Sequence, residues 1–323
     1  MAGAELCDSG PPGTAGWSEE RFAEVGAIEL CYQEMGDPAG EPMVLVMGLG
    51  MQMIAWEDGL CELLAGAGFR VIRFDNRDTG RSTAVRAPAP TRVAMLAGLR
   101  RGLAYTLDDL ADDAAGLIDA LELDSAHVVG ASMGGMIAQV VGYRAPDRVR
   151  SLGLIMTGSG KRTVSMPRLR ALGALLQDAP EGREAQAEHA VRLFRLIGSP
   201  TFAANDERIR AHALAAYDRG RNRAGAARQL HAITASGDRR RRLRSVRAPT
   251  VVIHGSRDPL VRPAAGRSVA AAIPGARLVI VPGMGHDLPP EVWPTVAGEV
   301  LANARRAPAV RPGAPRRRRV ASA

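Results

Sequence analysis

Residues 128–135 read VVGASMGG, and this stretch decides the fold. A short apolar run leads into Ser132, with Gly130 two residues before it and Gly134 two residues after it. The pattern G-x-S-x-G is typical of a serine at the apex of a sharp turn between a strand and a helix. A glycine-rich turn that contains a serine by chance has the same spacing, so the rest of the chain must decide between the two interpretations.

Apolar runs of strand length recur on both sides of this stretch. They are continuous rather than alternating, which favours strands covered on both faces, as in a parallel sheet. The expected strands are residues 43–47, 69–74, 126–131, 151–156, 249–255 and 276–283. Helical patterns lie between them, one of which follows a capping box formed by Thr106 and Asp109. This alternation predicts an α/β fold, with a mostly parallel central sheet and helices on both faces.

The alternation of strands and helices stops in one long interval, which suggests an inserted segment. Residues 158–247 are rich in Ala, Arg and Leu, and we expect a helical cap over the carboxyl edge of the sheet; the run Arg239–Arg242 within it is expected to be solvated. Residues 21–36 resemble an antiparallel hairpin at the sheet edge. The expected organisation is a flexible leader (1–20), an α/β core (21–157 and 248–304), the cap (158–247) and a disordered Arg/Pro-rich tail (305–323).

The net charge of +8 suggests a nucleic-acid partner, but its distribution argues against one. Seven arginines and no acidic residue lie from Arg305 onward, so the charge is concentrated in the tail and the remaining body is nearly neutral. We therefore expect a small-molecule substrate and no nucleic acid. No uninterrupted apolar stretch reaches the length of a membrane span, and the N-terminal residues do not resemble a secretory signal.

The cysteines indicate the compartment. Cys7, Cys31 and Cys61 are odd in number and fit no metal-binding or redox spacing. Free thiols are typical of a reducing compartment, so we expect a cytoplasmic protein.

A serine hydroxyl needs a base to take its proton before it can act as a nucleophile. His286 lies in PGMGHDLPP, a loop just beyond the last expected strand, where a base could reach Ser132. The other histidines are interpreted as structural: His127 and His254 lie within strands, and His189, His212 and His231 lie in the expected cap. His286 is therefore the predicted base.

The imidazole in turn needs an acceptor on its other nitrogen, which fixes the tautomer. Asp258 follows the strand expected over 249–255, and the 28 positions from it to His286 fit one helix and one strand. The segment TGSG after the strand expected over 151–156 contains no acid, and Asp287 is too close in sequence to His286 to face it well. The order Ser132, Asp258, His286 is that of a catalytic triad on this type of sheet.

Acyl transfer also requires backbone N–H groups that face the developing oxyanion. Met133 follows the serine at the start of a helix, where the helix dipole favours negative charge. Its expected partner is the N–H of Leu49, in the loop MGLGMQM after the first parallel strand. A plain strand–helix connection is the alternative interpretation of that loop.

These motifs, taken in order, resemble the α/β-hydrolase superfamily over residues 21–304. LVMGLGMQMIAW, VIRFDNRDTGRS, YTLDDLADDA, HVVGASMGGMIAQ and PGMGHDLP are similar to an esterase-like branch that includes aclacinomycin methylesterase. The resemblance implies the same triad and the same oxyanion donors. It also implies that Asp75 and Arg77 brace loops. Many members have His-Gly before the oxyanion residue, whereas this chain has Met47-Gly48, which leaves backbone donation possible.

Methionines gather in or beside the expected active-site segments, and methionine suits adaptable apolar pockets. We expect Met51, Met53, Met136 and Met284 to line the substrate pocket. The resulting hypothesis is a serine carboxylic-ester hydrolase, without cofactor or metal, that acts on a methyl ester or a bulky apolar ester. The alternatives are carbon–carbon bond hydrolysis or haloperoxidase-type perhydrolysis by the same triad, and a non-catalytic binding protein. The sequence leaves the oligomeric state open.

Overall fold

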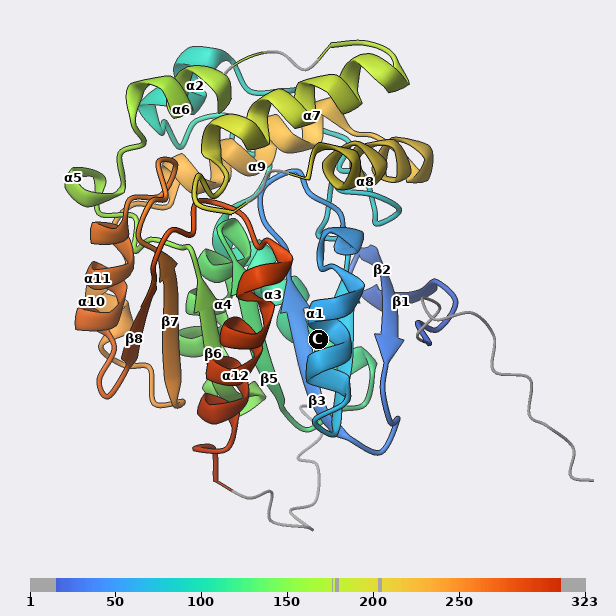
Figure 1. Cartoon of the computed structure of the whole chain (residues 1–323), viewed down its shortest axis with the longest axis vertical. Coiled ribbons are helices and arrows are strands. Elements are labelled where there is room, and N and C mark those ends of the chain that lie inside the picture. Colours follow the sequence, from blue (N-terminus) through green and yellow to red (C-terminus); the bar gives the residue numbers. More distant parts are fainter. Residues whose placement is uncertain (1–15, 176, 178–179, 203–204, 309–323) are drawn as a thin grey trace, which may run out of the picture.

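The computed structural model describes residues 16–175, 177, 180–202 and 205–308. Its centre is an eight-stranded sheet with the order β1-β2-β4-β3-β5-β6-β7-β8 (Figure 1). The strands are β1 (Arg21–Val25), β2 (Ile28–Met35), β3 (Glu41–Val46), β4 (Phe69–Phe74), β5 (Ala126–Ala131), β6 (Val149–Ile155), β7 (Thr250–Gly255) and β8 (Arg277–Val281). β1 and β2 form the expected antiparallel hairpin at one edge, and the strands from β4 to β8 in this order run parallel. The predicted α/β-hydrolase fold, with a mostly parallel sheet, is confirmed.

Helices cover both faces of the sheet, which explains why the parallel strands are apolar throughout. One face packs on α1 (Asp58–Ala65) and α12 (Trp293–Ala304), and the other packs mainly on α3 (Leu107–Ala120), α4 (Met133–Arg144) and α11 (Pro263–Ala272) (Figure 1). The capping box is present at α3: the Thr106 side chain accepts from the Asp109 N–H, and the Asp109 carboxylate accepts from the Thr106 N–H.

A layer of helices lies above the carboxyl edge of the sheet (Figure 1). It includes α6 (Leu169–Leu175), α7 (Arg183–Ile197), α8 (Asp206–Arg219) and α9 (Arg223–Ala235), with the short α5 (Arg162–Ser165) at its margin. Two details differ from the expected cap over 158–247. α2 (Arg92–Ala97), from outside that interval, packs on α9, whereas α10 (Arg240–Leu243) packs beside α11 and α4.

The expectation of a solvated Arg239–Arg242 run is wrong for its first member. Arg239 is 2% exposed, and its guanidinium donates to the Gly158 carbonyl at 2.7 Å and to the Ser236 hydroxyl at 2.8 Å. The bond to Gly158 joins the segment that enters the helical layer to the segment that leaves it. The carbonyl and hydroxyl oxygens accept hydrogen bonds from the buried guanidinium and so allow its burial. A run of charged residues in the sequence does not reveal such acceptors.

The end of the expected leader is also held in place. Trp17 donates from its indole nitrogen to Asp58 at 2.8 Å and lies under the Arg73 guanidinium, while Glu20 pairs with Arg81 and Arg219. Residues 17–20 are thus part of the packed body, which corrects the predicted boundary. Residues 1–15 of the predicted leader, which include Cys7, lie outside the described residues. Residues 309–323 of the predicted tail also lie outside them.

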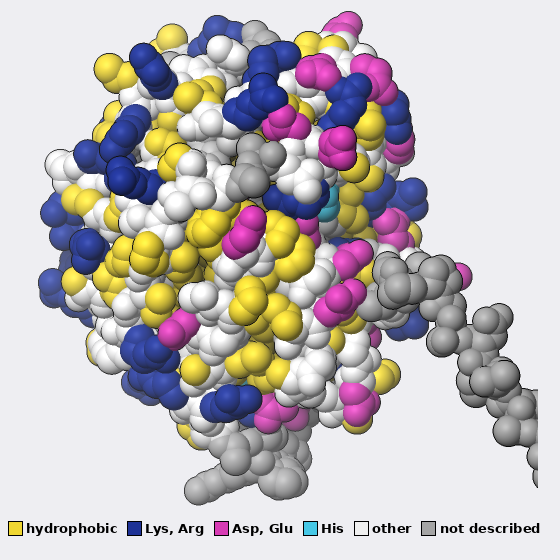
Figure 2. Space-filling view, viewed as in Figure 1, with side chains coloured by type: hydrophobic (Ala, Val, Ile, Leu, Met, Phe, Trp, Pro, Cys, Tyr) yellow, Lys and Arg dark blue, Asp and Glu magenta, His cyan; other side chains and the backbone are white. Residues whose placement is uncertain are grey.

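Charge on the described surface is mixed. Figure 2 shows acidic and basic side chains on the same face, with hydrophobic side chains between them. Across the described ranges, no helix is both long and apolar enough to span a bilayer.

His127 is a buried imidazole within β5, and we expect it to make the fold less stable at acid pH. Its side chain is 0% exposed; Nδ1 lies 2.8 Å from the Ser151 hydroxyl and Nε2 lies 3.1 Å from a Glu41 carboxylate oxygen. Burial lowers the pKa of His127 to about 4, against about 6.5 in an unfolded chain. Between these two values the unfolded state binds a proton that the folded state does not bind. The contribution of the neutral His127 to the free energy of unfolding should therefore be fully present above about pH 6.5. It should fall as the pH is lowered toward 4.

We expect His127→Gln to reduce the pH dependence of the unfolding free energy between pH 7 and 5. Glutamine can still accept from Ser151 and donate to Glu41, but it has no proton to take up. Urea unfolding at several pH values measures the effect. Equal slopes for wild type and His127→Gln would contradict the prediction.

Candidate active site

Ser132 lies at the junction of β5 and α4, in the sharp turn that the glycines predicted. Its backbone has φ 53° and ψ −114°, an unusual conformation for a residue with a side chain. A Cβ at Gly134 would overlap the Val46 carbonyl, and a Cβ at Gly130 would overlap the Gly134 carbonyl. Glycine at both positions therefore lets β3, β5 and α4 approach closely enough to form the turn.

The backbone around Ser132 is fixed by hydrogen bonds. Its N–H donates to the Ile155 carbonyl of β6 at 2.9 Å, and its own carbonyl accepts from the Thr157 hydroxyl at 2.8 Å. Strain of this kind persists where the surroundings hold the residue in place. Thr157 was missed in the sequence, although it is a polar residue just beyond a strand at the carboxyl edge.

The register of the parallel strands brings the expected site loops together. Val46 pairs with Gly130, Ala131 pairs with Ile155, and Gly255 pairs with Val281, so their following loops emerge at the same edge. Side chains beyond these strand ends can therefore meet, although they are far apart in the chain.

His286 faces both predicted partners. Its Nε2 lies 3.0 Å from the Ser132 Oγ, and its Nδ1 lies 2.7 Å from the Asp258 Oδ2. His286 is 7% exposed and Asp258 is 2% exposed. Because a carboxylate only accepts, Nδ1 carries the proton and Nε2 is free to accept from the serine hydroxyl.

Asp258 is held by its own loop. Its second oxygen, Oδ1, accepts from the N–H groups of Leu260 at 2.9 Å and Val261 at 2.8 Å. His254 lies 3.6 Å from Asp258, but its Nε2 bonds the Val261 carbonyl, and burial lowers the pKa of His254. His254 is therefore a neutral, buried neighbour of the site, in agreement with its structural interpretation.

The end of α7 holds the loop that carries His286. The His286 N–H donates to the Ile197 carbonyl at 2.8 Å, and the Gly285 N–H donates to the Ser199 hydroxyl at 2.8 Å. Ser199 in turn donates to Asp287. Asp287 thus has its own partner, and burial raises its pKa. The helical layer therefore restricts the position of the imidazole.

The two predicted oxyanion donors lie beside Ser132. Met133 is the first residue of α4, and a Cβ at Gly48 would lie 3.3 Å from the Ser132 Cβ, so the loop containing Leu49 runs against the serine. Among the described residues, neither the Leu49 N–H nor the Met133 N–H donates to a protein acceptor. Free N–H groups in this position can bind an oxyanion.

A cavity of about 730 Å³ opens beside Ser132 and His286, between the sheet and the helical layer. Its wall is mainly apolar. The methionines that line it come from the α/β core and from the segments around the helical layer: Met47, Met51, Met95, Met136, Met156 and Met166. Arg208 and His212 of α8 also contribute to the lining. Burial lowers the pKa of His212, which favours its neutral form. This composition and size suit a bulky organic molecule.

The cavity is lined by two of the four methionines expected in the substrate pocket. Met51 and Met136 line the cavity, whereas Met53 and Met284 do not and are both 0% exposed. Met53 begins a short turn whose N–H is held by Asp75 at 2.7 Å, and Met284 packs in the core beneath α12. Both lie in site segments, but their side chains turn into the core.

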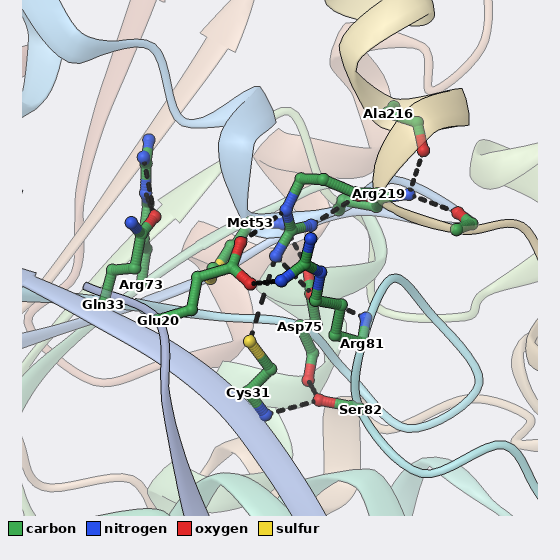
Figure 3. A network of polar contacts seen from close by, with 12 residues as sticks. Glu20, Cys31, Gln33, Met53, Arg73, Asp75, Arg81, Ser82, Ala216 and Arg219 are labelled. Carbon is green, nitrogen blue, oxygen red and sulfur yellow. Dashed lines mark hydrogen bonds and ion pairs between the residues drawn. The ribbon is translucent and has the colours of Figure 1, made fainter.

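Asp75 and Arg77 brace loops, as expected. Asp75 is 0% exposed and accepts from the N–H groups of Met53 and Arg81 and from the Arg219 guanidinium of α8 (Figure 3). Arg77 forms a two-pronged ion pair with Asp113 of α3. The described part of the chain contains no cluster of three or more His, Cys, Asp or Glu side chains that could hold a metal ion.

Comparisons with known proteins identify the fold family. A family model described as alpha/beta hydrolase fold matches residues 41–291. Rhodomycin D methylesterase DnrP of Streptomyces peucetius is 32% identical over 302 residues, which cover 87% of this chain and 96% of that protein. Rhodomycin D methylesterase DauP of Streptomyces sp. (strain C5) is 32% identical over 306 residues, with the same coverage. The enol-lactonase from Burkholderia xenovorans LB400 superposes with a TM-score of 0.68 at 27% identity, over 88% of this chain and 100% of that one.

Proposed function

The chain belongs to the α/β-hydrolase fold family, and on that premise we propose that it is a serine esterase with Ser132 as nucleophile, His286 as base and Asp258 as the orienting carboxylate. Ester hydrolysis is the activity that the fold and the methylesterase relatives support. The observation that carries the residue roles is the pair of contacts made by His286, at 3.0 Å to Ser132 and 2.7 Å to Asp258, at the wall of an apolar cavity.

In the first half of the proposed reaction, Ser132 Oγ attacks the ester carbonyl while its proton passes to His286 Nε2. The N–H groups of Leu49 and Met133 stabilise the negative oxygen of the tetrahedral intermediate. His286 then gives its proton to the departing alkoxide, which leaves as the alcohol and produces an acyl-Ser132 ester.

In the second half, water attacks the acyl carbon, and His286 takes a proton from the attacking water. The carbon–Oγ bond breaks, the proton returns to Ser132, and the carboxylic acid leaves. Asp258 keeps its bond to His286 Nδ1 and stabilises the imidazolium that forms in each half. The proposed reaction needs no other reactant than ester and water.

We further propose that the substrate is a methyl ester of a bulky, largely apolar acid. The relatives' printed activity supports the methyl ester, and the cavity volume with its methionine-rich wall supports the bulky acyl part. Methionine side chains adapt to irregular apolar shapes, so the wall can fit a bulky acyl group.

A comparison of two methyl esters tests this proposal. We expect kcat/KM for methyl anthracene-2-carboxylate to exceed that for methyl acetate by at least about 100-fold, because burial of the rings contributes on the order of 3 kcal/mol. Methanol release measures both rates. Equal values would contradict the bulky acyl part, and failure of a wider ester series to release any alcohol would contradict the esterase itself. Product analysis with vinylogous diketones and with peroxide checks the carbon–carbon and perhydrolysis alternatives.

The described cysteines bear on where the protein works. Cys31 and Cys61 are buried, free thiols. Thiols that stay unpaired fit a reducing compartment, which supports the proposed cytoplasmic location.

A further inference from the structure

The geometry points to Gln229 of α9 as the positioning residue for the oxyanion loop, defined here as residues 48–51. We propose that its side chain holds the Gly50 N–H and thereby directs the neighbouring Leu49 N–H toward the reacting oxygen. The inference rests on the proposed function, because it concerns the transition state of that reaction. It assigns a role in the chemistry to a helix of the cap.

Gln229 is 0% exposed, and its side-chain amide is fully engaged. Its Oε1 accepts from the Gly50 N–H at 2.8 Å. Its Nε2 donates to the Arg77 carbonyl and to the Thr79 hydroxyl, both at 2.9 Å. The orientation of the amide is unambiguous, because a backbone N–H can only donate and a backbone carbonyl can only accept.

The oxyanion loop is a tight turn with a defined middle peptide. The Met51 N–H donates to the Gly48 carbonyl at 3.3 Å, and Gly50 has φ +65° whereas Leu49 is not among the residues with positive φ. This combination is that of a type II turn with glycine at its third position. In type I the peptide between Leu49 and Gly50 is turned over, so the Gly50 N–H points the other way. An acceptor at Oε1 of Gln229 therefore selects type II.

Both peptide planes that meet at the Leu49 Cα are thus held. The Leu49 N–H shares its plane with the Gly48 carbonyl, which Met51 fixes, and the Leu49 carbonyl shares its plane with the Gly50 N–H, which Gln229 fixes. The Gly50 N–H is already used, which leaves the Leu49 N–H for substrate. If Gln229 is lost, the second plane can rotate. This rotation moves Met51 and weakens its bond to the Gly48 carbonyl, which holds the first plane, so the Leu49 N–H then samples a wider range of directions.

α9 is firmly attached to the loops that surround this turn. Arg228, next to Gln229, makes a two-pronged ion pair with Asp78 at 2.8 and 2.7 Å, and both side chains are buried. A Cβ at Gly225 would overlap the Asp78 carbonyl, and a Cβ at Gly50 would lie 3.2 Å from the Ala226 Cβ. The helix therefore presents Gln229 from a rigid base, which is what positioning requires.

The primary test is Gln229→Leu, which has a similar volume and no amide. Because full removal of an oxyanion donor costs about 10²–10³ in kcat, we expect misdirection of one donor to lower kcat by about ten- to fiftyfold. KM should change by less than about threefold, since the ground-state ester does not use this donor fully. The control is His231→Gln on the same helix, which alters a buried bond to the Leu99 carbonyl without touching the oxyanion loop. It should lower thermal stability without lowering kcat more than about twofold.

The inhibition constant (Ki) of a trifluoromethyl ketone distinguishes positioning from a purely structural role of Gln229, because a structural role would leave this Ki unchanged. Ser132 Oγ adds to the carbonyl carbon of the ketone, the serine proton passes to His286, and the former carbonyl oxygen becomes an oxyanion. Its Ki should rise in Gln229→Leu by the same factor as kcat falls. A wild-type kcat in folded Gln229→Leu, an unchanged Ki, or an equal loss in His231→Gln would overturn the inference.

Wild-type protein provides a second measurement, which holds even if Gln229→Leu fails to fold. Amide hydrogen exchange by NMR should show the Gly50 N–H protected before the ketone is added, and the Leu49 N–H protected only afterwards. A Gly50 N–H that gains protection only with the ketone would overturn the assignment. Failure of wild-type protein to hydrolyse any ester would instead contradict the proposed function.

Discussion

Ser132→Ala should lower kcat/KM for ester hydrolysis by about 10⁴- to 10⁶-fold, which is the largest effect we predict. The change removes the atom that forms the acyl-enzyme and leaves only the oxyanion donors and the cavity. The fold should be retained, because the backbone bonds from Ser132 to Ile155 and from Thr157 do not use the serine hydroxyl. Steady-state kinetics with a p-nitrophenyl ester, together with a thermal melt, measures both consequences.

Ser125→Ala is the matched control, since Ser125 immediately precedes β5 and Ser132 immediately follows it. It should retain wild-type activity within about twofold, as surface substitutions away from special features have small effects. Retention of most ester turnover by Ser132→Ala would refute the assignment of the nucleophile.

Asp258→Asn should reduce kcat by about 10⁴-fold, the second largest predicted effect. Asparagine can keep its carbonyl oxygen toward the N–H groups of Leu260 and Val261, so the loop should persist. Its NH₂ group then faces His286 Nδ1, which must accept. The proton moves to Nε2, where it blocks uptake of the serine proton. Rapid-mixing kinetics of acylation locates the loss in the step that uses Ser132.

Asp287→Asn distinguishes the two carboxylates near His286. Asp287 bonds Ser199 rather than the imidazole, and asparagine can still accept from that hydroxyl. We expect a loss of less than about tenfold, because this residue belongs to the His286 loop but does not orient the ring. A loss equal to that of Asp258→Asn would contradict the roles given to these aspartates.

Much of the fold could be predicted because it is encoded in local patterns. The run expected over 151–156 is strand β6 (Val149–Ile155), and the run expected over 249–255 is β7 (Thr250–Gly255). The strands are apolar throughout because helices cover both faces of the sheet. A continuous apolar run therefore predicts a buried parallel strand. The candidate triad could be predicted because parallel strands place the residues after their carboxyl ends at one edge.

Other features depend on contacts that no local pattern encodes. Gln229 bonds Gly50 across 179 positions, within a helical segment where glutamine is unremarkable. Arg239 belongs to a charged run that is typical of a surface, yet the distant Gly158 carbonyl and the nearby Ser236 hydroxyl accept from it and allow its burial. Met53 and Met284 lie in predicted site loops, but the direction of a side chain from a loop is set by backbone angles that composition does not specify.

The central claim is that Ser132 is the residue that becomes acylated, and a fluorophosphonate probe tests it most directly. The probe should add one phosphonyl group per chain at Ser132, located by peptide mass spectrometry, with parallel loss of ester hydrolysis. Ser132→Ala should take up none. An adduct on another residue, or full hydrolysis by protein that carries the adduct on Ser132, would contradict the account.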